Sequence, residues 1–419
     1  MRKLAWFAVG FGAVCLWSCY DGLGPVQLLV PLLLALGGWL ASRPGERESP
    51  ILLRKPRGRG RRVRWGLYQV SRRGLALCLG GLAAFGWCAA YFALFRAPAQ
   101  SWAGEDVPLS GEVSSYPVPT SIGGYGVTLR LDGGFFAPDV LAYGPEEWGT
   151  LKPGDRLSCA ARVKGAERAY GGETTYYTAK GVYLLAYCRQ EAEIRAADRV
   201  PLRHWPALCA HELNAGIYAA FDAAAAPIAA AVTLGDKRGL DETLFSAFNR
   251  AGLMHAAVVS GFHISFLVRM ALAVCPRRRR AALALVPLLV FYALMAGGTP
   301  SAFRAVIMQS ALLAAPLAGR EEDGPSALGA ALLVLLVQNP FAAASVGLQL
   351  SFASVAGILL VSGPLLERMY RPLRKKRPAK EKRVELLLWR AGRTALAGVS
   401  ASLGAMLFTA PLIALYFGQ

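Results

Sequence analysis

Long apolar runs, separated by short polar or basic segments, are the main pattern along this chain. Three of them occupy residues 4–20, 23–41 and 75–95, and the first two are close enough to form a hairpin of membrane spans. A cleaved signal is the alternative for the first run, because Leu16-Trp17-Ser18-Cys19 faintly resembles a lipoprotein cleavage site. Later runs occupy residues 250–268, 282–296, 303–318, 327–337, 344–362 and 396–417. The pattern predicts a polytopic α-helical membrane protein.

Between residues 100 and 200 the pattern changes to short runs rich in Val, Tyr, Leu and Thr, separated by clusters of Gly, Pro and Asp. The expected strands are Val107–Tyr116, Tyr125–Asp132, Val140–Tyr143, Arg156–Val163 and Tyr177–Cys188. Five strands in about 90 residues suit a small closed β-barrel of the OB (oligonucleotide/oligosaccharide-binding) type. A β-sandwich is the alternative, because a strand count does not fix how the strands connect.

The next segment, residues 202–233, is rich in alanine but begins with polar residues such as His204, His211 and Glu212. Because its start is too polar to cross a bilayer, we expect an interfacial or re-entrant helix. The chain therefore has three predicted parts: spans with a basic loop (residues 1–98), an OB-like β domain (99–200) and a membrane domain (201–419).

Charge sets the expected orientation. The 419-residue chain has a net charge of +19, yet residues 101–200 carry 10 Lys and Arg against 13 Asp and Glu. The excess lies mostly in three basic runs, at residues 42–73, 277–280 and 368–383, and alternating the spans puts all three on one side. By the positive-inside rule that side is the cytoplasm. The β domain is then extracytoplasmic, in a multi-pass protein of the inner, or plasma, membrane.

Cofactor and metal sites find no support in the sequence. The eight cysteines include no Cys-x-x-Cys pair, and no Walker-type Gly-x-x-x-x-Gly-Lys-Ser/Thr sequence is present. We therefore expect no metal, no cofactor and no ATP hydrolysis by this chain. Cys159 and Cys188 fall in the fourth and fifth expected strands and can pair across a hairpin outside the cytoplasm, where disulfides persist. Two reduced, buried thiols are the alternative.

Polar residues inside the apolar run 250–268 are candidates for function, because ionisable groups are costly at membrane depth. His255 and His263 are eight residues apart. That spacing is about 12 Å along a helix, so one straight helix cannot bring both to one metal ion. Ser260 and His263 are adjacent on a helix surface and raise the alternative of an intramembrane hydrolase, but no oxyanion donor can be named. The other interpretations are pore-facing histidines, core histidines bonded to carbonyl groups, and close helix packing at Ser260-Gly261.

A second candidate is an anion site at residues 297–304, Gly-Gly-Thr-Pro-Ser-Ala-Phe-Arg. Thr299 is positioned to cap a helix with Pro300 at its first position, which puts Arg304 about one turn into that helix. A cation there opposes the helix dipole, whereas free N–H groups and a guanidinium together suit a phosphate. The alternatives are an arginine that reaches the membrane interface or one that pairs with a carboxylate.

Two further polar residues, Gln349 and Ser351, lie in the apolar run 344–362. Side chains of this kind form hydrogen bonds between helices in membranes. That interpretation is favoured for Ser351, and a role in a transport path stays open for Gln349.

Four sequence elements resemble those of the ComEC family of competence DNA channels, and they come in the family's order. The first is Leu234-Gly235-Asp236-Lys237-Arg238-Gly239-Leu240. The second is Gly252-Leu253-x-His255 followed by Ser260-Gly261-Phe262-His263, where the family usually has Leu instead of Phe262. The third is Gly297-x-x-Pro300-Ser301-x-x-Arg304-Ala305. The fourth is Asn339-Pro340 followed by Gly347-Leu348-Gln349-Leu350-Ser351-Phe352, with Leu348 in place of the family's Phe.

The resemblance implies a channel that admits single-stranded DNA to the cytoplasm during natural transformation. The partners it implies are single-stranded DNA, membrane lipid, a DNA receptor and a cytoplasmic translocation ATPase, and a homo-oligomer stays open. Phe303 is a further candidate beside Arg304, because a DNA path needs flat surfaces as well as cations. The residues assigned to the DNA path or channel are His255, Ser260, Gly261, Phe262, His263, Thr299, Arg304 and Gln349.

Three qualifications accompany this resemblance. The acidic balance of the β domain argues against an electrostatic DNA platform there, although stacking by Phe135, Phe136, Tyr170, Tyr176 or Tyr177 stays open. No His-x-His-x-Asp-His cluster is present, so the nuclease activity of the family's metallo-β-lactamase-like domain is not carried over and we expect no enzyme. The sequence stops at Gln419 in an apolar run, so we expect a fragment or a truncated reading frame. The alternative functions are a degenerate or structural membrane protein and, less favoured, the hydrolase.

Overall fold

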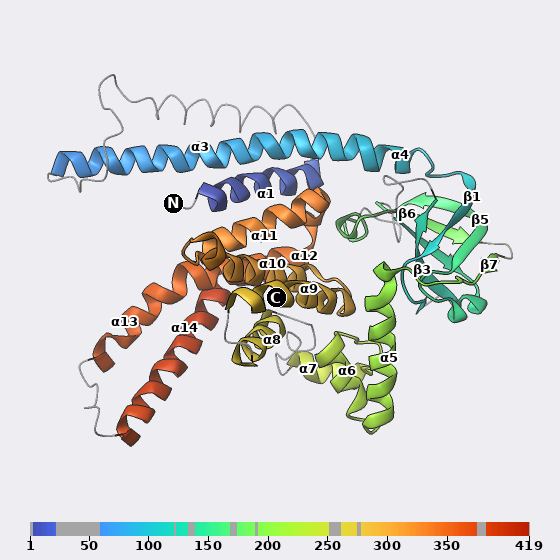
Figure 1. The fold of residues 1–419 in the computed structure, drawn as a ribbon. Helices are drawn as coiled ribbons and strands as arrows, with labels where there is room; N and C mark the ends of the chain where they lie inside the picture. Colours follow the sequence, from blue (N-terminus) through green and yellow to red (C-terminus); the bar gives the residue numbers. More distant parts are fainter. Residues whose placement is uncertain are drawn as a thin grey trace.

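The computed structural model describes residues 3–21, 59–120, 123–132, 139–167, 174–188, 192–250, 261–274, 278–374 and 383–418. It shows a mostly helical molecule with a β-barrel at one end (Figure 1). Among the described residues, five segments are long and apolar enough to cross a membrane: Lys3–Tyr20, Arg73–Gln100, Pro300–Ala318, Val346–Arg371 and Leu387–Phe417. Shorter apolar helices accompany them. The predicted fold class, a polytopic helical protein with a small barrel domain, is confirmed.

Helices α1 (Lys3–Asp21) and α3 (Arg59–Tyr91) lie side by side and run in the same direction toward the barrel (Figure 1). Their backbones approach closely, because a Cβ atom at Gly80 would lie 2.0 Å from the Phe7 carbonyl oxygen. After α3 the chain makes a π-helical turn, Phe92–Arg96, and a short helix α4 (Ala97–Gln100), then enters the barrel. Small residues at such a contact allow the close packing that holds helices together in membranes.

The basic segment before the third predicted span is partly helical. We expected a loop over residues 42–73, but the chain is helical from Arg59 onward. The expectation was wrong for these residues because Arg, Leu and Gln are strong helix formers, so a helix continues beyond its apolar part. The predicted span at residues 23–41 lies outside the described residues.

The barrel is built from five strands and carries two short additional ones. The strands are β1 (Asp106–Val113), β2 (Val118–Pro119), β3 (Tyr125–Leu131), β4 (Asp139–Gly144), β5 (Arg156–Gly165), β6 (Val182–Cys188) and β7 (Glu193–Arg195). Strands β1, β3, β4, β6 and β5 are neighbours in that order, and β5 pairs again with β1, which closes the barrel. Within this ring β4 and β6 are parallel, and the other pairs are antiparallel. The predicted OB-like barrel is therefore observed, and the sandwich alternative is excluded.

The barrel interior is filled by the alternate side chains of its strands, as the period of two along a strand requires. Leu129, Val140, Leu157 and Leu184 are fully buried there. The expected fifth strand begins later than predicted, because a 3₁₀ turn, η3 (Thr178–Lys180), precedes β6.

Cys159 on β5 and Cys188 on β6 form a disulfide, with their Cα atoms 6.3 Å apart. The two strands pair directly, so the bond joins neighbouring strands of the barrel.

The disulfide predicts the outcome of a thiol-labelling experiment. We expect the thiols of Cys159 and Cys188 to react with a maleimide only after the folded protein has been reduced. We also expect the Cys159→Ser, Cys188→Ser double variant to lose about 2–4 kcal/mol of stability, because an opened loop raises the entropy of the unfolded chain. Intact-protein mass before and after reduction is the measurement, and full labelling without reductant would show that the bond is absent.

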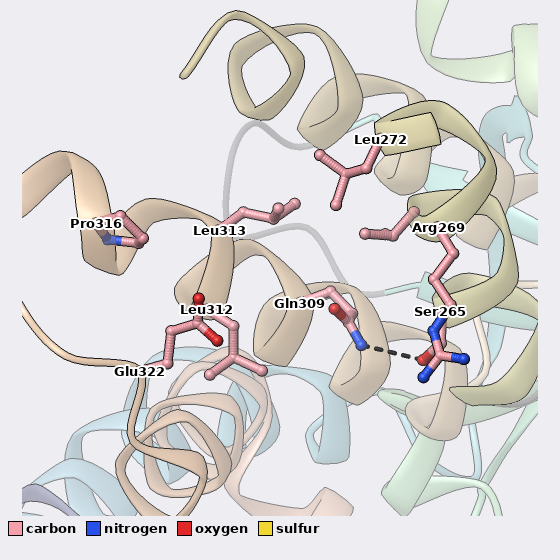
Figure 2. A pocket seen from close by; sticks show the side chains of 9 residues that line it. Ser265, Arg269, Leu272, Gln309, Leu312, Leu313, Pro316 and Glu322 are labelled. Atoms are coloured by element: carbon pink, nitrogen blue, oxygen red, sulfur yellow. Dashed lines mark hydrogen bonds between the residues drawn. The ribbon is translucent and has the colours of Figure 1, made fainter. Parts of the chain in front are cut away.

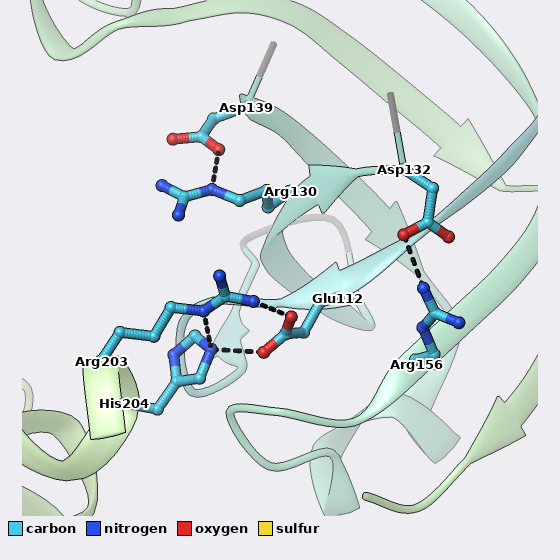
Figure 3. Close-up of polar contacts among 7 residues, drawn as sticks. All are labelled: Glu112, Arg130, Asp132, Asp139, Arg156, Arg203 and His204. Carbon is cyan, nitrogen blue, oxygen red and sulfur yellow. Dashed lines mark hydrogen bonds and ion pairs between the residues drawn. The ribbon is translucent and has the colours of Figure 1, made fainter. Parts of the chain in front are cut away.

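Helix α5 (Trp205–Ala220) leaves the barrel and runs across the direction of α1 and α3, followed by α6 (Ala226–Leu234) and α7 (Glu242–Arg250) (Figure 1). Figure 3 shows how its start is fixed: Glu112 on β1 accepts a hydrogen bond from Arg203 and lies 2.6 Å from Nε2 of His204. The exposed face of this segment carries Leu202, Trp205 and Leu213. The segment is helical as expected, and its place at the membrane interface stays a prediction.

The remaining helices form the C-terminal half. They are α8 (Gly261–Val274), α9 (Arg278–Met295), α10 (Pro300–Ala314), α11 (Gly324–Gln338), α12 (Val346–Gly357), α13 (Gly363–Arg374) and α14 (Arg383–Phe417). A 3₁₀ turn, η6 (Pro340–Ala344), joins α11 to α12, and a π-helical turn joins α12 to α13. As at α3, helices extend into the last basic run, residues 368–383, because α13 ends at Arg374 and α14 begins at Arg383.

Contacts between helix ends show which ends lie on the same side. The hydroxyl groups of Tyr20, near the end of α1, and Tyr416, near the end of α14, are 3.3 Å apart. Cys19 lies beside η6, with its Sγ 3.8 Å from the Phe341 carbonyl oxygen. The barrel lies at this end of the bundle, so the ends that lead into the three basic runs lie away from it (Figure 1).

This arrangement predicts the outcome of a labelling experiment. In a protein that lacks the other unpaired cysteines, an impermeant maleimide added to intact cells is expected to label Thr150→Cys in the barrel region and not Arg371→Cys on α13. Both positions are exposed in the protein. The physical reason is that the positively charged run beside Arg371 is retained in the cytoplasm. Labelling of Arg371→Cys in sealed cells would contradict the orientation.

Candidate functional site

Arg304 lies near the start of α10, on a helix whose start is defined locally. Gly297 and Gly298 have φ values of +79° and +62°, a left-handed conformation that favours glycine and turns the chain from α9 into α10. Thr299 then caps the helix, with its side-chain oxygen accepting a hydrogen bond from the Ala302 N–H at 3.3 Å, and Pro300 occupies the first position. The predicted cap is therefore present.

The Arg304 side chain is buried between α8, α10 and α12. It is only 7% exposed, and its guanidinium carbon is 6.0 Å from the centre of the Phe352 ring on α12. On α8, a Cβ atom at Gly261 would lie 3.7 Å from Nη2 of Arg304. Of the two alternatives, an arginine that reaches the interface does not fit this burial.

Within the described part of the chain, Arg304 has no ion pair and its buried Nε has no hydrogen-bond partner. A buried charge is costly unless it is paired, so this arrangement is unfavourable for the folded protein alone. The chemistry available to the Arg304 guanidinium is the binding of an anion. An arginine offers a planar donor fork that matches a phosphate.

Polar groups continue from Arg304 along the α8–α10 contact. Gln309, five residues after Arg304, donates a hydrogen bond from Nε2 to Ser265 Oγ on α8 at 3.0 Å. These two residues and Arg269 line a cavity of about 330 Å³, with Glu322 at its opposite end (Figure 2). Sequence reasoning missed this cavity, although an arginine at position 269 within an apolar helix was a signal that could have found it.

The structure describes only some of the other residues that the sequence assigned to the DNA path. His263 lies on α8, two residues before Ser265 of the cavity wall, and is half-buried. His255 and Ser260 lie outside the described residues, as does the side chain of Phe262. The structure therefore brings Gly261 to Arg304 but leaves the signature serine and the first histidine untested.

Gln349 and Ser351 both take part in contacts between elements. Ser351 Oγ on α12 is 3.2 Å from Ser301 Oγ on α10, beside the start of the helix that carries Arg304. Gln349 donates to the Ala343 carbonyl oxygen at 2.9 Å and accepts from the Tyr416 hydroxyl at 2.7 Å. Its amide thus links η6 to α14, so Gln349 bonds between helical elements as Ser351 does, while its role in a transport path stays a prediction.

Asn339, in the Asn-Pro element, joins the barrel to the helices, a role that sequence reasoning did not foresee. Its Nδ2 donates to the carbonyl oxygens of Thr178 and Ala179 in η3, at 3.0 and 3.3 Å. Its Oδ1 accepts from the Phe341 N–H at 3.0 Å. Phe341 itself is 5% exposed and belongs to the hydrophobic core of the barrel. The helical part therefore contributes a side chain to the barrel core.

Arg96, at the end of the π-helical turn that follows α3, strengthens the same joint. Its guanidinium lies over the Phe341 ring, 4.6 Å from the ring centre, and pairs with Glu167 at the end of β5. We expect Asn339→Ala to lower the free energy of unfolding of the barrel by roughly 1–3 kcal/mol, because two carbonyl oxygens and a capping contact lose their donor or acceptor. Limited proteolysis of the purified whole protein is the measurement, with Gln338→Ala, an exposed neighbour, as control. Equal cleavage of both variants would contradict the role of Asn339.

A known protein family matches the C-terminal part of the chain. Residues 232–419 match the model of the Competence protein family, a range that includes α8 to α14 and Arg304 but not the barrel. Over 139 residues the chain is 30% identical to ComE operon protein 3 of Bacillus subtilis (strain 168). That alignment covers 32% of this chain and 18% of the relative, so the chain spans well under two thirds of the relative's length. No solved structure matches the chain.

Proposed function

We propose that this chain, whose residues 232–419 match the Competence protein family and whose sequence elements are those of the ComEC competence proteins, forms part of the channel through which single-stranded DNA enters the cell during natural transformation. The observation that carries the proposal is Arg304, a buried cation with no counter-charge among the described residues. A phosphate of the passing strand is the anion that would pair with it. The cavity lined by Ser265, Arg269 and Gln309 continues the polar groups along the same two helices.

The proposal assigns roles to the remaining parts. The apolar helices hold the path in the inner membrane, with the barrel on the outer side. Energy for transport comes from a partner such as a cytoplasmic ATPase, because the chain has no Walker sequence. A DNA receptor outside the membrane delivers the strand. Ser260, which the hydrolase alternative requires, lies outside the described residues, so no contact in the structure favours that alternative.

The test is DNA uptake in cells that lack this chain. A competent strain with the gene deleted is expected to bind labelled DNA at its surface but to accumulate no DNase-resistant single strand inside. Restoring the gene should restore internal DNA. Normal internal accumulation in the deletion strain would contradict the proposed function.

A further inference from the structure

Three cysteine residues meet where the ends of α1 and α3 lie against each other. Cys15 and Cys19 lie on successive turns of α1, and Cys88 lies on α3. The sulfur atoms of Cys15 and Cys88 are 3.7 Å apart, so the two thiols are in direct contact. Cys15 is fully buried and Cys88 is 1% exposed. The two residues are 73 positions apart in the chain, so only the fold brings them together.

The packing of α1 on α3 holds this pair of thiols in place. The backbones approach closely, because a Cβ atom at Gly10 would lie 1.9 Å from the Leu77 carbonyl oxygen. Around the sulfur atoms, Phe11, Val14 and Ala84 complete one buried cluster. A disulfide has its sulfur atoms about 2.05 Å apart, so bond formation requires the two sulfur atoms to approach by only about 1.7 Å.

The disulfide of the barrel lies at the same end of the molecule. Cys159 and Cys188 are bonded within the barrel, and the ends of α1 and α3 point toward it (Figure 1). The predicted orientation puts this end outside the cytoplasm, where disulfides form and persist. The oxidant that forms the barrel disulfide therefore acts on the side of the membrane on which the three cysteines lie.

Cys19 connects the buried pair to the surface. It is only partly buried, and its Sγ is 3.1 Å from the Cys15 carbonyl oxygen and packs against the cluster that holds Cys15 and Cys88. Toward η6 the same sulfur atom is 4.0 Å from the Pro340 carbonyl oxygen and 3.8 Å from that of Phe341. Thiol–disulfide exchange depends on access, so an oxidant meets Cys19 before the buried pair.

We propose that Cys15 and Cys88 form a second disulfide, which joins α1 to α3 covalently, and that Cys19 is the thiol through which the pair is oxidised. The oxidant is the disulfide of an extracytoplasmic thiol oxidoreductase. The inference is independent of the proposed DNA channel, because it uses only the packing of α1, α3 and η6.

The oxidation balances as a series of thiol–disulfide exchanges. The Cys19 thiolate attacks the disulfide of the oxidant, forms a mixed disulfide and releases one thiolate of the oxidant. The Cys88 thiolate then attacks the Cys19 sulfur, which releases the second thiolate of the oxidant and leaves a Cys19–Cys88 bond. The Cys15 thiolate attacks the Cys88 sulfur and releases Cys19. In sum, Cys15 and Cys88 lose two electrons and two protons, the oxidant gains them as two thiols, and the Cys19 thiol is regenerated.

The second disulfide fixes the helix ends on which the barrel rests. Cys19 adjoins η6, and Phe341 of η6 fills part of the barrel core. A bond between α1 and α3 therefore holds together the elements that carry this joint. It also closes a loop of 73 residues, and a closed loop of that length restricts the unfolded chain.

The experiment follows each thiol separately in the whole chain. Reduced protein in lipid nanodiscs is exposed to oxidised glutathione, quenched with acid at intervals, alkylated in denaturant and digested. Mass spectrometry is expected to show the Cys15 and Cys88 peptides joined by a disulfide. Cys78, which is buried on the same helix, is the control and should be alkylated throughout.

Two variants test the exchange route. Cys19→Ser should slow the formation of the Cys15–Cys88 bond by oxidised glutathione at least about tenfold, because the buried pair loses its accessible thiol. Diamide, a small oxidant that enters apolar surroundings, should restore the bond in this variant, which shows that the pair is still in contact. Cys15→Ala removes the last exchange and should accumulate the Cys19–Cys88 bond. The barrel disulfide should form at the same rate in all variants, as a check of folding.

The proposal is overturned if Cys15 and Cys88 are both alkylated without reductant after exhaustive oxidation. It is equally overturned if acid quenching of intact cells finds the two thiols reduced while Cys159 and Cys188 are bonded. Equal rates with and without Cys19 would disprove the exchange route. DNA uptake enters none of these measurements, so a failure here is distinct from a failure of the proposed channel.

Discussion

Arg304→Ala is expected to abolish entry of labelled DNA into the cytoplasm, while the protein still inserts in the membrane at normal abundance. The physical reason is that the guanidinium is buried and lacks a counter-charge among the described residues, so it is available to a phosphate of the strand. Arg304→Lys should retain part of the activity, because a lysine keeps the charge but not the bidentate geometry. DNA bound at the cell surface should accumulate in both variants.

The stability of the variants separates this role from a structural one. Removal of a structural arginine would lower the thermal midpoint. Replacement of an unpaired buried charge by an apolar residue instead removes the cost of burying that charge, so it is expected to be neutral or stabilising. We therefore expect Arg304→Leu to melt no lower than the unmodified protein, with the exposed Arg390→Leu as the matched control. Normal uptake by Arg304→Ala, or a large loss of stability in Arg304→Leu, would refute the anion site.

Gly80→Leu is expected to separate α1 from α3 and to remove most of the folded protein. A Cβ atom at Gly80 would lie 2.0 Å from the Phe7 carbonyl oxygen, and one at Gly10 would lie 1.9 Å from the Leu77 carbonyl oxygen. These neighbours are backbone atoms, which cannot move aside as a side chain can. Overpacking of this kind costs about 1–3 kcal/mol, and more where backbone must shift.

Gly86→Leu is the matched control, because it lies on the same helix and a Cβ atom there has nothing within 4 Å. Both substitutions make the same change in helix propensity, so any difference between them reports the contact with α1. Size-exclusion of detergent extracts and thermal melting measure the folded fraction. Equal yields of the two variants would show that the close approach of α1 and α3 is not needed for folding.

Local sequence signals predicted elements well wherever the determining residues are neighbours in the chain. Alternating residues in the barrel marked β1, β3, β4 and β5 to within a few residues, because a strand's two faces follow its sequence directly. The Thr299 cap was equally predictable, since the capping oxygen and the N–H it accepts from are three residues apart. The ends of α3 and α14 were not predictable in this way. Hydropathy changes where a span leaves the lipid, but helix propensity does not, so each helix continues beyond its apolar residues.

Among the described residues, the sequence by itself thus determined most of the apolar helices, the barrel strands and the position of Arg304 near a helix start. Only the tertiary structure decided what surrounds those residues. Closure of the barrel depends on β5 returning to β1, and burial of Arg304 depends on Gly261 and Phe352 from other helices. The Tyr143–Tyr187 stack likewise depends on the parallel pairing of β4 with β6. These contacts join residues that are distant in the chain, and the local periodicity of a sequence carries no information about which distant segments will pack together.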